Sequence, residues 1–77
     1  MQWQKLGNVN PPNKTLLLIH VPDFDSVKFA IRDGDEIEVG DGFCRGELGG
    51  VLLKCSLKDL QTVYQNAYWC LFKRPGE

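Results

Sequence analysis

The chain has 77 residues, enough for a single domain spanning residues 1–77, and its 43% hydrophobic and 25% charged residues are ordinary for a globular protein. A net charge of −1 provides no general attraction to nucleic acid or to anionic lipid, and no apolar run approaches the ~20 residues that a membrane helix needs. The N-terminus lacks a signal pattern and the three cysteines are an odd number, so we expect a cytoplasmic protein with free thiols.

Residues 1–14 are rich in Gly, Asn and Pro, and we expect an irregular lead-in whose Trp3 and Leu6 fold back onto the core. The stretch 15–21 is an apolar run closed by Pro22–Asp23, which predicts a strand in the middle of a sheet, buried on both faces. A single helix covers only one face of a sheet. The other face therefore needs a barrel-like curl, the two lead-in side chains, or a second subunit.

A turn leads into a predicted β-hairpin over residues 26–39, in which apolar and polar residues alternate. We expect a three-residue loop, 32–34, with Gly34 in the left-handed bulge position. That register sets three pairs of residues opposite one another: Phe29 with Ile37, Val27 with Val39, and Lys28 with Glu38.

Gly40–Gly42 is the next predicted turn, and a second hairpin over residues 43–55 is expected to turn at Gly49–Gly50. This register places Leu48 opposite Val51, Gly46 opposite Leu53, Cys44 opposite Cys55 and Arg45 opposite Lys54. The last of these pairs is a like-charge pair, which disfavours the register.

Ser56 followed by Asp59 resembles a capping box, and apolar residues at helical spacing predict one helix at about 57–65. An aromatic last strand at 67–73 follows, stopped by Pro75–Gly76. We therefore expect a small α+β domain, a curled antiparallel β-sheet with one helix in the C-terminal half, for which an SH3-like, partly open barrel is one arrangement.

The two ends of the chain resemble a known pattern. Trp3–Leu6, the prolines at 11 and 12 before Leu16–Ile19, and Tyr68–Leu71 running into Pro75 resemble family 551 among the domains of unknown function. In the family's C-terminal box, Tyr68 stands where a His is usual, and two prolines are absent. The resemblance covers about a third of the chain. It implies a phage or prophage origin and assigns no catalytic residue.

Two groups of side chains are candidates for chemistry. Cys44, Cys55, Cys70 and His20 make a Cys₃His set, but the cysteines lack the close pairs typical of structural zinc sites, so buried thiols are the main prediction. Six acidic residues fall within fifteen positions: Asp33, Asp35, Glu36, Glu38, Asp41 and Glu47. Such a segment is typical either of a surface that meets a basic partner or of a solvated hairpin face.

Catalysis is not expected, because the chain has one histidine and no nucleophile elbow, phosphate-cradling loop or H-E-x-x-H motif, and no cofactor is implied. The function predicted from the sequence is a small protein-interaction module, encoded by a phage or mobile element, that inhibits a host or defence protein through an acidic hairpin surface. The predicted partner-binding residues are Asp33, Asp35, Glu36, Glu38 and Asp41. The alternatives are a structural homo-oligomeric subunit, dimerising through an open edge strand, and a zinc-stabilised module.

Overall fold

The computed structural model describes residues 2–24 and 26–72, which form a mostly β domain with one helix. The elements in chain order are β1 Gln4–Lys5, β2 Leu16–His20, β3 Lys28–Asp33, β4 Glu36–Cys44, β5 Glu47–Ser56, α1 Leu57–Val63 and β6 Tyr68–Leu71. All strand pairs are antiparallel, in the order β1-β6-β2-β3-β4-β5.

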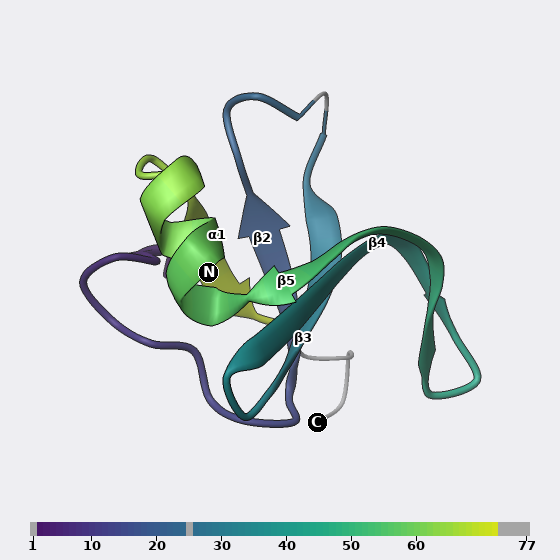
Figure 1. Ribbon diagram of the computed structural model, residues 1–77. Helices are drawn as coiled ribbons and strands as arrows, with labels where there is room; N and C mark the ends of the chain where they lie inside the picture. Colours follow the sequence, from purple (N-terminus) through teal and green to yellow (C-terminus); the bar gives the residue numbers. More distant parts are fainter. Residues whose placement is uncertain (1, 25, 73–77) are drawn as a thin grey trace.

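The sheet is open. The strands β1 and β5 lie at its two ends and do not pair with each other, so the expectation of a curled or barrel-like sheet is wrong. The helix α1 lies over one face of the sheet, and the β4–β5 hairpin bends at the opposite side of the molecule (Figure 1). The reason is topological, since the short β1 strand pairs with β6 and not with the far edge.

The apolar run of residues 15–21 contains an interior strand of the sheet, as predicted, but the prediction that both its faces are buried is wrong, since Leu16 and Leu18 are only half-buried. β2 is bordered by β6 and β3, and both Leu17 and Ile19 are fully buried. They belong to a core that lies between the sheet and α1. The buried apolar residues of that core are Leu6, Leu17, Ile19, Val21, Ala30, Ile37, Val39, Leu57, Leu60, Ala67 and Trp69.

The N-terminal segment is fixed to the body by hydrogen bonds. The backbone N–H of Leu6 donates to the carbonyl of Ala67 at 2.9 Å, and the side chain of Leu6 is fully buried, as predicted. Gln61 donates from Nε2 to the carbonyl of Leu6 at 2.8 Å. Trp3 does not fold onto the core: it is 40% exposed and meets the edge of the His20 ring, because it directly precedes the edge strand β1.

The β3–β4 hairpin has a different register from the predicted one. Its turn is the two-residue pair Gly34–Asp35, at whose first position a type II′ turn takes glycine. The observed pairs are Phe29 with Gly40, Ala30 with Val39, Ile31 with Glu38, Arg32 with Ile37 and Asp33 with Glu36. The prediction failed because it assigned Phe29 to the core face, whereas the small Ala30 is the residue fully buried there.

The β4–β5 hairpin turns at Arg45–Gly46, where both residues have positive φ, 55° and 81°, as a type I′ turn requires. The predicted turns at Gly40–Gly42 and Gly49–Gly50 are therefore wrong, since both lie inside strands. Cys44 pairs with Glu47, Cys55 with Ile37, and Lys54 with Glu38, so neither the cysteine pair nor the like-charge pair forms.

The second face of the sheet, opposite α1, carries half-buried apolar residues including Leu16 and Leu18. Leu18 lies opposite Phe29 in the β2–β3 register. The Phe29 ring lies 6.4 Å from that of Phe43, on the bent hairpin, and 5.7 Å from that of Phe72, which follows β6. Partial cover for this face thus comes from the chain itself, from Phe72 and from a hairpin whose turn and bend the sequence patterns did not identify.

The predicted helix is confirmed, with a slightly earlier end at Val63. Ser56 is its N-cap, and its Oγ accepts a hydrogen bond from the backbone N–H of Asp59 at 3.1 Å. The predicted last strand is confirmed as Tyr68–Leu71. Its proposed end at residue 73 and its stop at Pro75–Gly76 lie outside the described residues, as does position 25 of the predicted turn.

Replacing Ser56 with alanine is expected to lower the free energy of unfolding by about 1 kcal/mol, because the first turn of α1 loses its hydroxyl acceptor. Aspartate at position 56 restores an acceptor and should recover most of the loss. The matched control is Ser26→Ala, which removes an exposed hydroxyl and should change stability by less than about 0.5 kcal/mol. Urea titration followed by circular dichroism measures all three variants.

Candidate functional site

The candidate site is a hollow of about 380 Å³ on the β3–β4–β5 side of the molecule. We call it the acidic hollow. Its walls come from the turn of the β3–β4 hairpin, from the adjoining part of β5, and from the tip of the bent β4–β5 hairpin. The lining residues are Ile31, Asp33, Glu36, Glu38, Gly46, Glu47, Leu48 and Lys54.

Charge in the acidic hollow is strongly negative. Four carboxylates and one ammonium group line it, which leaves a local net charge of −3 in a chain whose total is −1. The Nζ of Lys54 lies 3.4 Å from Glu38 and 3.7 Å from Glu36. Both pairs are solvent-exposed and contribute little to stability, so an incoming cation can replace Lys54 beside Glu36 or Glu38 at little energetic cost.

Apolar side chains complete the acidic hollow. Ile31 from β3 and Leu48 from the start of β5 line the hollow beside the carboxylates. A lysine or arginine side chain has the same combination, an aliphatic stem with a charged head. The hollow can therefore accept a basic side chain by apolar contact and charge together.

The structure divides the predicted acidic surface. Asp33, Glu36 and Glu38 all line the acidic hollow, so these three residues form one surface. Asp35 instead lines a separate hollow beside α1, in the company of the cations Arg32 and Lys58. Asp41 forms an ion pair of 2.6 Å with Lys28. These two residues are thus not part of the candidate site.

Sequence reasoning missed five lining residues: Ile31, Gly46, Glu47, Leu48 and Lys54. Glu47 belongs to the predicted acidic segment but not to the predicted partner-binding residues. The β4–β5 register is the signal that would have found Lys54, because it places Lys54 opposite Glu38.

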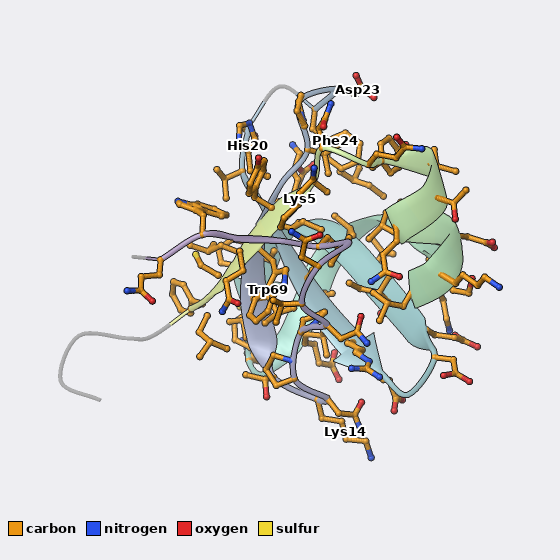
Figure 2. All side chains as sticks on the ribbon, turned by 90° about the vertical axis from the view of Figure 1, so that its left-hand side faces the viewer. Lys5, Lys14, His20, Asp23, Phe24 and Trp69 are labelled. Atoms are coloured by element: carbon orange, nitrogen blue, oxygen red, sulfur yellow. The ribbon has the colours of Figure 1, made fainter. Side chains whose placement is uncertain are left out.

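The four candidate metal ligands are not gathered at one point. Cys44 is exposed at the hairpin tip, so the prediction of buried thiols is wrong for this residue. Cys55, on β5, is half-buried opposite Ile37 of β4, and Cys70 is buried on β6. His20 projects on the side of the sheet away from α1 (Figure 2), and its ring lies 6.4 Å from that of Trp3. Within residues 2–24 and 26–72, no three His, Cys, Asp or Glu side chains are placed to share a metal ion.

Burial raises the pKa of the Cys55 thiol, and the nearby Asp59 carboxylate raises this pKa further. Burial also raises the pKa of Cys70. We expect iodoacetamide at pH 8 to modify the exposed Cys44 first, because alkylation requires a thiolate and access. Peptide mass spectrometry over time gives the order of modification, and faster modification of Cys70 than of Cys44 would contradict this prediction.

The raised pKa values of Cys55 and Cys70 also affect stability. These two thiols contribute stability below about pH 8.5 that is lost at higher pH.

The aromatic side chains are divided between core and surface. Trp69 is buried beside the N-terminal segment, where its Nε1 donates to the carbonyl of Val9 at 2.9 Å (Figure 2). Trp3 and Tyr68 are each 40% exposed at the β1–β6 edge. They lie apart from the acidic hollow and are not among its lining residues.

No protein family, no curated protein and no solved structure matches the chain. The resemblance at its two ends therefore stays a prediction. Among the described residues, no helix has both the length and the apolar character to cross a membrane.

Proposed function

We propose that this chain is a protein-binding module, not an enzyme, whose acidic hollow receives a basic side chain or short basic segment of a partner protein. One observation carries the proposal: three of the predicted acidic residues meet Glu47, Ile31 and Leu48 around one recess with a net charge of −3. Exposed carboxylates attract a basic partner over about one Debye length, roughly 8 Å at physiological salt.

The biological setting is proposed from the sequence. A phage or other mobile element encodes the module, which acts in the cytoplasm by inhibiting a host or defence protein. Such inhibitors work by occupying a basic surface and need no reacting group. The small size of the chain suits this role, since an acidic surface requires no enclosed pocket.

Neutralising the acidic hollow is expected to abolish capture of basic proteins. The test variant is Glu36→Gln with Glu38→Gln, and the matched control is Asp23→Asn with Asp59→Asn, which removes the same charge from exposed residues outside the hollow. Each contact between unit charges is worth about 1 kcal/mol in water, so two lost contacts predict a loss of affinity of about tenfold or more.

The measurement is affinity capture from a host lysate, quantified by mass spectrometry. Proteins of high isoelectric point should be retained by the unchanged chain and by the control, and lost from the hollow variant. They should also be lost at about 1 M salt, where the Debye length is about 3 Å. Equal retention by the hollow variant and the control would overturn the proposal.

A structural homo-oligomer is the second candidate function, and the free edge of β5 favours it. Among the residues that the structure describes, this ten-residue strand pairs on one side only, with β4, and its Val51 and Leu52 are 50% and 53% exposed. Open edges of this kind support strand pairing between copies. Sedimentation over a range of protein concentrations separates the two functions, since only the oligomer predicts a concentration-dependent mass.

A further inference from the structure

The β4–β5 hairpin has a bend that separates its distal part, residues 41–52, from the body. We call residues 41–52 the distal hairpin. Val39 lies opposite Leu53, whereas Gly40 lies opposite Val51, so β5 carries one extra residue at this point. The bend is visible where β4 and β5 arch away from the rest of the sheet (Figure 1).

Glycines on both strands allow this bend. A Cβ at Gly40 would lie 2.8 Å from the backbone oxygen of Gly49, so the two strands approach more closely than side chains permit. Gly50 has a φ of +56°, a conformation that favours glycine. The bend therefore lies beside three glycines, Gly40, Gly49 and Gly50, which carry no Cβ atoms to hold the two strands apart.

Few contacts hold the distal hairpin against the body. The Phe43 ring lies 6.4 Å from the Phe29 ring, and Asp41 pairs with Lys28 next to the bend. None of its residues is fully buried, and most are exposed. Its own strand pairs, from Gly42 with Gly49 to Cys44 with Glu47, lie entirely within it. The pair of Gly40 with Val51 crosses its base, and the distal hairpin can thus move as a unit with the pairs inside it intact.

We propose that the distal hairpin is a flap that pivots at its base, where β5 carries its extra residue next to Gly40, and that its closed position supplies one wall of the acidic hollow. Gly46, Glu47 and Leu48 line the hollow from the flap, and the other lining residues belong to the body. Opening removes Glu47 and Leu48 from the hollow, and closure brings them onto an occupant. Control of binding by the flap rests on the proposed function, whereas the motion itself does not.

Relaxation-dispersion NMR on the whole chain, with no binding partner present, tests the motion. We expect microsecond-to-millisecond exchange at residues 41–52 and at Phe29 and Ile31 beneath them, and little exchange in β2 and β6. Phe43→Ala removes the ring contact and should raise the population of the open state severalfold over that in the unchanged chain. The flap resonances then move toward the open state, while the β2 and β6 resonances keep their positions. Uniform exchange over the whole chain, or none in residues 41–52, would overturn the flap.

Titration with a hexa-arginine peptide separates this inference from the proposed function. If the flap closes on an occupant, the peptide should suppress the exchange at residues 41–52. Peptide binding at the hollow without flap exchange overturns the flap alone. Flap exchange without peptide binding overturns the proposed function, and with it the control of binding, but leaves the motion standing.

Discussion

Replacing Leu17 with alanine is expected to remove most of the protein's free energy of unfolding at 25 °C. Leu17 is fully buried in the interior strand β2 and belongs to the core between the sheet and α1. Truncating a buried leucine costs about 2–5 kcal/mol, as the sum of a transfer term and a cavity term. A domain of this size has a net stability of roughly 5 kcal/mol, so this loss removes most of it.

Urea unfolding followed by far-UV circular dichroism measures the effect on the midpoint. The matched control is Leu52→Ala, the same change in the same sheet at a side chain that is 53% exposed, with an expected effect below about 0.5 kcal/mol. Similar losses for the two variants would mean that β2 does not lie at the centre of the core.

Replacing Gly40 with alanine is expected to be the most damaging glycine substitution in the sheet. The new Cβ would lie 2.8 Å from the carbonyl oxygen of Gly49, and a backbone atom cannot rotate away. Overpacking of this kind costs about 1–3 kcal/mol. The bend must open to relieve the contact, so the Phe43–Phe29 contact should weaken together with global stability.

The control for this substitution lies two residues along the same strand. Gly42→Ala adds a Cβ with no atom within 4 Å and should be neutral or slightly stabilising, because alanine loses less chain entropy on folding. Urea midpoints give the stabilities, and the chemical shifts of Phe29 and Phe43 report the bend. Equal midpoints for the two variants would contradict the close approach at Gly40.

The sequence patterns identified the strand at Leu16–His20, the capped helix and the last strand. Each has a strong local signal: a long apolar run, a capping residue before helical spacing, or an aromatic run. The hairpin registers were not predictable in the same way. Alternation of Phe29 and Ile31 with Lys28, Ala30 and Arg32 separates two faces of the strand, but it does not say which face the helix covers.

The acidic hollow could be predicted only in part. Asp33, Glu36 and Glu38 belong to one hairpin, and their crowding in the sequence was enough to select them. Glu47 and Leu48 reach the hollow because the chain bends at Gly40, a backbone approach that no periodic pattern reveals. Asp41 was selected by proximity in sequence and is instead neutralised by Lys28.

The most direct test of the central claim is an amide chemical-shift map with the hexa-arginine peptide at low salt. Binding at the acidic hollow predicts that the largest shifts fall on Ile31, Asp33, Glu36, Glu38, Glu47, Leu48 and Lys54. The shifts should disappear in the Glu36→Gln, Glu38→Gln variant and persist in the Asp23→Asn, Asp59→Asn control. Shifts centred on Asp23 and Asp59, or no shifts at low salt, would contradict the assignment of this hollow as the binding site.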